Sequence, residues 1–212
     1  MVYKNRFEAG KVLGSMLEAY RSERTVVLAI PNGGVPVGIE IAKALGAELG
    51  LMIARKILFP FTTEAGFGAV TFDGSAFIDR DSARRNGVSE GEIERQKERA
   101  LQSIEARVEY YRDVIDFPDL KEKVVVITDD GIAAGSTMLA SIEGIKKREP
   151  RELIVAVPTA PFHSVEKIEH LVTKVVCPDI KRGFSFAVAN AYEKWYDIEN
   201  EEVKTLLQAY SP

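Results

Sequence analysis

The chain has 212 residues, of which 46% are hydrophobic, so it can bury one sizeable core. Its formal net charge of −4 argues against a general nucleic-acid-binding protein, which would carry a surplus of basic residues. The sequence begins with no apolar signal region and has no run near the roughly 20 apolar residues of a membrane span. We therefore expect a cytoplasmic protein with no nucleic-acid or membrane partner. The single cysteine, Cys177, lies in an apolar run and is expected to be a buried structural thiol.

The first part of the chain predicts a helix, a strand, a glycine-rich turn and a second helix. Apolar side chains recur at helical spacing over residues 6–20, and a continuous apolar run over 25–30 predicts a buried strand. The turn Pro31-Asn32-Gly33-Gly34 follows, and the next helix is expected at 35–45. This turn is either a tight connection that needs glycine for its backbone angles or an anion-binding loop at the carboxyl edge of a sheet.

Two cations follow the next predicted strand. Residues 49–54 are expected to form this strand, and Arg55 and Lys56 stand at its end. They are either solvated side chains or partners for a phosphate group. The stretch 59–75, which is rich in Gly, Pro and Thr, is expected to be mostly loop, with short strands flanking it near 69–72 and 76–78.

The rest of the chain continues the alternation of helices and strands. A long helix with a solvated, charged face is expected at about 81–112. Apolar runs predict strands at 124–127, 153–157 and 172–177, and a helix is expected at 161–170.

This alternation defines the expected fold class, which is α/β with a doubly wound, mainly parallel sheet flanked by helices. We expect one domain over residues 1–212, with a core at about 24–177 and a C-terminal segment at 178–212. That segment is rich in aromatic residues without a long period, among them Phe184 and Trp195. Its rings either pack against the edge of the core or offer flat surfaces to a ligand.

The stretch 124–138 carries the strongest chemical pattern. Its apolar strand ends at two adjacent carboxylates, Asp129 and Asp130, and a loop of mostly small residues then leads into a helix. Backbone N–H groups of such a loop and of the helix N-terminus suit a phosphate, whereas the carboxylates suit a ribose diol or a divalent metal. The alternative is an acidic pair that only ends a strand and caps a turn. The loop consists of Gly131, Ile132, Ala133, Ala134, Gly135, Ser136 and Thr137.

This segment resembles the signature that binds 5-phosphoribosyl 1-pyrophosphate (PRPP) in type I phosphoribosyltransferases. That signature is an apolar strand, two acidic residues and a small-residue loop ending in T-G-x-T. Here Ala134 stands where the family usually has Thr, which removes one hydroxyl but no backbone donor. The motifs PNGGVPVG, ARK and a late WY extend the resemblance over about residues 29–195, toward a poorly characterised prokaryotic branch of the family.

The resemblance implies a fold and an activity. The fold would be that of type I phosphoribosyltransferases, with a small hood in the C-terminal segment and a flexible loop at 59–75 that closes over PRPP. The activity would be transfer of ribose 5-phosphate from PRPP to a nitrogenous base, with release of pyrophosphate, as in purine and pyrimidine salvage. Mg²⁺ would be the cofactor, and a homodimer is the expected assembly.

The resemblance also assigns roles to residues. Asp129 and Asp130 would hold the ribose hydroxyls and contact the metal directly or through water, and residues 131–137 would hold the 5′-phosphate. Phe184 and Trp195 would contact the base, Lys56 is a further catalytic candidate, and a cis peptide is implied between Pro31 and Asn32. Pyrophosphate would be bound by Asn32, Gly33, Gly34, Arg55 and Lys56.

Two other functions stay open. The same fold serves regulators that sense PRPP or a nucleotide and catalyse little, although no added DNA-binding domain of a transcription factor is expected here. A receiver-like signalling domain also has acidic residues at a strand end, but it needs neither the glycine turn nor Gly135-Ser136-Thr137. Phosphorylation by acetyl phosphate would separate that function from PRPP binding.

Overall fold

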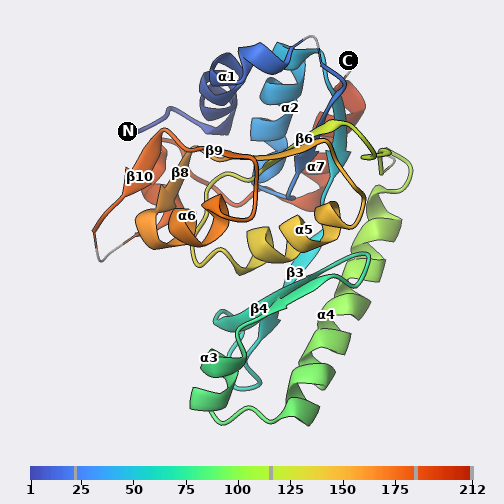
Figure 1. Ribbon diagram of the computed structural model, residues 1–212, viewed down its shortest axis with the longest axis vertical. Helices are drawn as coiled ribbons and strands as arrows, with labels where there is room; N and C mark the ends of the chain where they lie inside the picture. The colour runs from blue at the N-terminus through green and yellow to red at the C-terminus, as the bar shows by residue number, and fades with distance from the viewer. Residues whose placement is uncertain (22, 115–116, 184–185, 211–212) are drawn as a thin grey trace. The chain divides into compact units, whose positions relative to one another are not determined.

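The computed structural model describes residues 1–21, 23–114, 117–183 and 186–210 (Figure 1). The chain forms two compact units, here called the first and the second unit. The first unit comprises Met1–Met52, Asp113–Ala134 and Arg148–Pro212, and the second comprises Ile53–Arg112 and Gly135–Lys147. The expectation of a single domain stays a prediction.

A five-stranded parallel sheet is the centre of the first unit. Its strands are ordered β2-β1-β6-β7-β9, and each neighbouring pair is parallel. Every residue of β1 and β6 is buried, as expected for central strands that are covered on both faces. The predicted mainly parallel α/β fold is therefore confirmed. The strands are β1 Thr25–Ala29, β2 Glu48–Leu51, β6 Val124–Thr128, β7 Glu152–Ala156 and β9 Lys174–Val176.

Helices and a small two-stranded sheet complete the first unit (Figure 1). The sheet pairs β8 (Thr159–Pro161) with β10 (Asp179–Lys181) in parallel. Among the described residues, no helix combines the length and the apolar character needed to cross a bilayer. The α-helices of this unit are α1 Arg6–Met16, α2 Gly34–Leu45, α6 Phe162–Glu169 and α7 Asn200–Ala209, and the 3-10 helices are η1 Glu18–Tyr20 and η2 Val188–Ala191.

Two glycines bring α1 close to α2. A Cβ atom added at Gly10 would lie 2.6 Å from the Val37 carbonyl oxygen, and one added at Gly14 would lie 2.7 Å from the Cβ of Ala44. Because both distances are shorter than van der Waals contact, only glycine permits this helix crossing. The crossing holds the first residue of α1, Arg6, in a fixed place beside the sheet.

We expect Gly10→Ala to lower the free energy of unfolding by about 1–3 kcal/mol, because the added methyl overpacks a backbone contact. The change is measured by thermal or denaturant unfolding. The matched control is Gly91→Ala in α4, where the nearest atom to the added Cβ is the Nη1 of Arg95 at 3.7 Å. That control is expected to be neutral or slightly stabilising. Equal stability of the Gly10 variant and the wild type would show that α1 can shift away from α2.

The second unit joins an antiparallel sheet to three helices (Figure 1). The order of the strands is β3-β4-β5, and α5 packs on this sheet. Its strands are β3 Ala54–Leu58, β4 Gly66–Thr71 and β5 Ala76–Ile78, and its helices are α3 Arg80–Arg85, α4 Glu90–Tyr111 and α5 Ser136–Lys146.

Two predicted elements of this unit differ from the structure. The expected strand at 49–54 is in fact the end of β2 and the start of β3, so Arg55 and Lys56 lie within an antiparallel strand. The expected helix at 81–112 is divided into α3 and α4, because Gly87 adopts a left-handed conformation with φ of 73°. The strands expected near 69–72 and 76–78 are present as β4 and β5, although β4 begins earlier, at Gly66. The role of the stretch 59–75 as a lid stays a prediction.

Candidate active site

The acidic pair lies at the carboxyl edge of the parallel sheet. Asp129 and Asp130 directly follow β6, and the glycine turn follows the neighbouring strand β1. A Cβ atom added at Gly33 would lie 2.0 Å from Oδ2 of Asp130, and one added at Gly34 would lie 2.9 Å from Cα of Asp129. The two loops that the sequence singled out are therefore in direct contact, and glycine is required where the carboxylate meets the backbone.

Burial shapes the electrostatics of the acidic pair. The backbone N–H of Asp130 donates to Oδ1 of Asp129 at 2.8 Å, which holds the two carboxyl groups side by side. Burial raises the pKa of Asp129 well above its ordinary value, and the charge of Asp130 raises it further. Burial also raises the pKa of Asp130, although the nearby Arg6 guanidinium opposes that shift. Such a pair is favourable for hydroxyl donors or a cation, because both satisfy buried carboxylate oxygens.

Arg6 is the site residue that the sequence analysis missed. Its Nε donates to Oδ2 of Asp130 at 2.8 Å, and its Nη1 donates to the Tyr196 carbonyl oxygen at 2.9 Å. The residue is only 5% exposed. A signal was present in the sequence, because Arg6 precedes Ala9, Gly10 and Leu13 by three, four and seven residues and so shares the buried face of α1.

Aromatic residues of the C-terminal segment contact both Arg6 and Asp130. The guanidinium carbon of Arg6 lies 4.0 Å from the ring centroid of Trp195, a cation–π contact. The Tyr192 hydroxyl donates to the Asp130 carbonyl oxygen at 2.6 Å. Trp195 keeps 39% of its surface exposed. Phe184, the other predicted base contact, lies outside the described residues.

The first part of the predicted phosphate loop is held by neighbouring elements of the first unit. The backbone N–H of Ile132 donates to the Thr159 carbonyl oxygen at 3.0 Å, and the Ser164 hydroxyl donates to the Ala133 carbonyl oxygen at 2.8 Å. The N–H of Ile132 is therefore already engaged and is not among the donors that the loop can offer to an anion. A Cβ atom at Gly131 would lie 2.7 Å from a methyl group of Val188, so this position also needs glycine.

The second part of that loop, residues 135–137, belongs to the second unit. Gly135 is the N-cap of α5 and has φ of 84°, a left-handed conformation that suits glycine. Ser136 and Thr137 are the first residues of the helix, where backbone N–H groups lack intrahelical acceptors. The predicted strand–loop–helix order of this segment is confirmed.

The glycine turn is anchored on both sides. The peptide bond between Pro31 and Asn32 is cis, as predicted. Nδ2 of Asn32 donates to the Ile198 carbonyl oxygen at 2.7 Å and to Oδ1 of Asn200 at 3.1 Å, which ties the turn to the start of α7. The backbone N–H of Gly34 donates to the Ile30 carbonyl oxygen at 3.0 Å.

Arg55 and Lys56 belong to the second unit, where they have exposed positions on β3. Nε of Arg55 donates to the Ser103 hydroxyl at 3.1 Å, and partial burial and the nearby Arg107 lower its pKa. The prediction that these cations end a parallel strand is wrong, because the chain leaves the parallel sheet after Leu51 and joins the antiparallel one. Their contact with pyrophosphate, and the catalytic role of Lys56, stay predictions.

Cys177 is half-buried rather than fully buried. Burial raises the pKa of its thiol to about 11, which keeps the thiol protonated and unreactive at neutral pH. His163 and His170 are both exposed, and His170 pairs with Glu169 on the surface.

A parallel α/β sheet with a glycine turn and an acidic pair in contact at its carboxyl edge defines a protein of the class that binds sugar phosphates or nucleotides. Comparison with known proteins identifies the family. Residues 4–191 match the phosphoribosyl transferase domain family, and the chain belongs to it.

Relatives agree with this assignment. A protein provisionally named a phosphoribosyl transferase in two strains of Mycobacterium tuberculosis is 31% identical over 206 residues, which is 97% of this chain and 46% of the relative. The chain thus spans about half the length of the curated relatives it matches.

Solved structures show the same fold. The crystal structure of TT1426 from Thermus thermophilus superimposes with a TM-score of 0.83 at 31% identity, and the match covers 100% of both chains. A hypoxanthine phosphoribosyltransferase from Staphylococcus aureus gives a TM-score of 0.50 at 14% identity, covering 90% of this chain and 81% of that one. The fold is that of the type I phosphoribosyltransferases.

Proposed function

We propose that this protein is a PRPP-dependent enzyme that transfers ribose 5-phosphate to a nitrogenous base and releases pyrophosphate. The observation that carries the proposal is the contact between the Asp129-Asp130 pair and the Gly33-Gly34 turn at one edge of the parallel sheet. The acidic pair suits the ribose diol, and the glycine turn suits the pyrophosphate that is attached to the same sugar. Family membership supports the transfer chemistry.

The acidic pair would bind the ribose of PRPP. Two half-buried carboxyl groups held side by side can accept hydrogen bonds from the 2′- and 3′-hydroxyls. The negative charge at this point would also favour the positive character that develops at C1 as pyrophosphate leaves. Residues 131–137 would bind the 5′-phosphate and so hold C1 of the ribose in position for attack by the incoming base.

The turn at 32–34 would receive pyrophosphate, with Arg55 and Lys56 as candidate cations. The contacts of Asn32 with Ile198 and Asn200 fix the turn before the ligand arrives, so less ordering is needed on binding. Phe184 stays a candidate for contact with the base.

Mg²⁺ fits the donor set of the acidic pair, because hard cations prefer carboxylate oxygens. Within the described ranges, no group of three or more His, Cys, Asp or Glu side chains could hold a metal by itself. Asp129 and Asp130 would hold the metal, directly or through water. When bound, it would neutralise the charge of the leaving pyrophosphate.

We expect purified protein, supplied with PRPP, Mg²⁺ and a panel of purine and pyrimidine bases, to release pyrophosphate with at least one base. A coupled pyrophosphate assay measures the release, and reactions without a base give the background. PRPP binding without transfer to any base would favour a sensing module instead. A protein that does not bind PRPP would contradict both functions. The homodimer, the cytoplasmic location and the salvage role stay predictions.

A further inference from the structure

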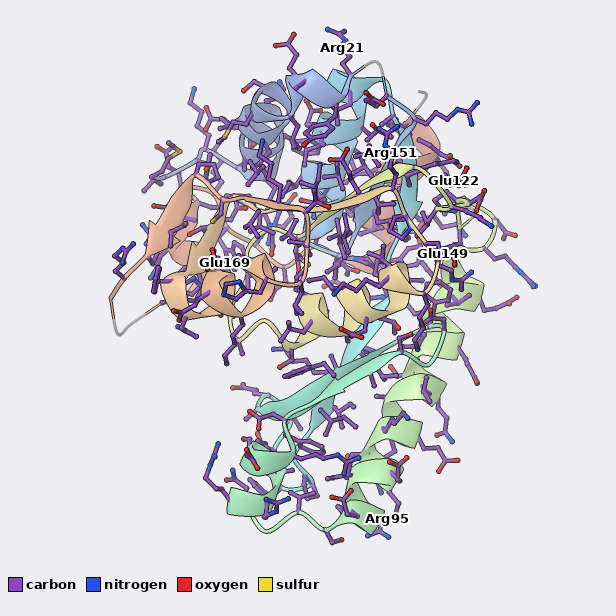
Figure 2. All side chains as sticks on the ribbon, viewed as in Figure 1. Arg21, Arg95, Glu122, Glu149, Arg151 and Glu169 are labelled. Atoms are coloured by element: carbon purple, nitrogen blue, oxygen red, sulfur yellow. The ribbon has the colours of Figure 1, made fainter. Side chains whose placement is uncertain are left out.

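The buried residue Arg6 forms an ion pair with Asp130 of the acidic pair. Arg6 is 5% exposed, and arginine is rarely buried unless its charge is paired. The side chains of Arg6 and Asp130 are 6% and 13% exposed at a separation of 2.8 Å. By contrast, Arg151, labelled in Figure 2, pairs with Glu23 through side chains that are 46% and 44% exposed. Surface ion pairs of that kind contribute little to stability, whereas breaking a buried ion pair leaves an uncompensated buried charge.

The guanidinium of Arg6 is held by the aromatic segment 192–196. Trp195 is the nearest ring, at 4.0 Å from the guanidinium carbon, and Tyr192 and Tyr196 follow at 5.7 and 5.8 Å. The carbonyl oxygen of Tyr196 accepts from Nη1 of Arg6. The segment therefore fixes the direction in which Nε points toward Asp130.

Asp130 is constrained from three sides. Arg6 binds its Oδ2, the backbone of Gly33 lies against its carboxyl group, and the Tyr192 hydroxyl binds its carbonyl oxygen. Loss of the Arg6 side chain would leave the carboxyl group free to rotate and without its charge partner. Loss of the Trp195 ring would act on the carboxyl group through Arg6. The other contact of Trp195, with the Tyr192 ring at 5.6 Å between centroids, leads to the Asp130 carbonyl oxygen and not to its carboxyl group.

We propose that Arg6 is a positioning residue that fixes Asp130 for the ribose hydroxyls, and that Trp195 serves PRPP binding by holding Arg6 rather than by stacking on the base. This inference rests on the proposed function, since the ribose hydroxyls are those of PRPP. It assigns a role to Arg6, and it replaces the role first predicted for Trp195.

The variants Arg6→Met, Arg6→Lys and Trp195→Leu test the proposal by calorimetric titration with PRPP and Mg²⁺. Inorganic pyrophosphate, which has no ribose, is titrated in parallel. The control for Trp195→Leu is Phe162→Leu, because Phe162 is 38% exposed and lies 4.2 Å under the guanidinium of Arg182. This control removes a cation–π contact of the same kind in the same unit, with a different arginine.

We expect Arg6→Met to weaken PRPP binding by roughly fiftyfold or more, and Trp195→Leu to weaken it by about fivefold. Arg6→Lys should restore part of the loss, because it keeps the charge without the stacked, forked geometry. Pyrophosphate affinity should stay within about twofold of wild type in every variant, which a general loss of structure would not allow. Phe162→Leu should leave both affinities unchanged.

A double-mutant cycle completes the test. Once Arg6 is replaced by Met, Trp195→Leu should cause little further loss of PRPP affinity, since its route to the Asp130 carboxyl group through Arg6 is gone. If Arg6→Met does not fold, Arg6→Gln takes its place in the cycle, because the neutral amide has no charge to stack on Trp195. Additive losses, or a Trp195 variant that binds PRPP normally but has a raised KM for the base, would overturn the inference.

The two proposals fail in different ways. Wild-type protein that does not bind PRPP would overturn the proposed function, and this inference with it. Wild-type protein that binds PRPP while the Arg6 and Trp195 variants bind it equally well would overturn the inference alone.

Discussion

Replacing both carboxylates, Asp129→Asn with Asp130→Asn, should abolish measurable PRPP binding and leave the fold intact. The amides keep the shape of the side chains, but they remove the charge and half of the acceptor oxygens that face the ribose hydroxyls. We expect a loss of at least about a hundredfold in affinity, measured by calorimetry with PRPP and Mg²⁺. Unchanged affinity would show that the sugar binds elsewhere.

Stability gives an independent measure of the acidic pair. The folded-state pKa of Asp129 is raised, so the stability that this group contributes is present below its unfolded pKa and is lost as pH rises through the folded value. Asp129→Asn cannot ionise, and it should therefore unfold at a higher temperature than wild type at pH 8, by roughly 2–4 °C.

The difference in unfolding temperature should shrink as the pH is lowered toward the ordinary pKa of a carboxyl group. Wild-type Asp129 is then protonated in the folded state and, like the Asn side chain, carries no charge. Thermal unfolding followed by circular dichroism at several pH values measures this trend. An Asp129 variant that is less stable than wild type at pH 8 would contradict it. The control is Asp179→Asn, because the pKa of Asp179 is lowered by the N-terminal ammonium and Lys181, so its replacement should remove stability at pH 8.

Gly33→Ala should weaken both the fold and PRPP binding. The added Cβ would lie 2.0 Å from Oδ2 of Asp130 and 2.4 Å from its Cγ, and Arg6 holds that carboxyl group in place. Asp130 would have to leave both Arg6 and its place beside the turn. We expect a loss of about 1–3 kcal/mol in the free energy of unfolding and a PRPP affinity lowered by roughly a hundredfold.

The matched control is Gly183→Ala, where no heavy atom lies within 4 Å of the added Cβ. Calorimetric titration and thermal unfolding compare the two variants under the same conditions. Normal PRPP affinity in Gly33→Ala would mean that Asp130 can bind the sugar without its contact with the turn. It would also weaken the proposed role of Arg6, since that contact is one of the constraints on the carboxyl group.

Local patterns in the sequence determined much of the fold. The apolar runs that became β1 and β6 are buried along their whole length, and such runs suit only central strands of a covered sheet. The glycine turn and the acidic pair each follow one of these strands. Because parallel strands end at the same edge, both loops could be expected at that edge. That β1 and β6 are neighbours, which brings the two loops into contact, was shown only by the structure.

Local sequence patterns gave wrong predictions where contacts between distant parts of the chain decide the secondary structure. Residues 49–54 form one apolar run, yet the chain changes sheets within it, because β3 pairs with β4 and not with the parallel strands. Spacing alone cannot report which partner a strand will choose. Nor does a long helical pattern show a break such as that at Gly87, where a left-handed residue separates α3 from α4.

The sequence by itself determined that a parallel α/β sheet would carry a glycine turn and two carboxylates at its carboxyl edge, since each directly follows a buried strand. Only the tertiary structure showed that Arg6 lies behind Asp130 and that Trp195 covers Arg6. These residues are 124 and 189 positions apart from Arg6 along the chain. A buried charge is stabilised by whichever partner the fold brings within about 3 Å, and sequence distance carries no information about that choice.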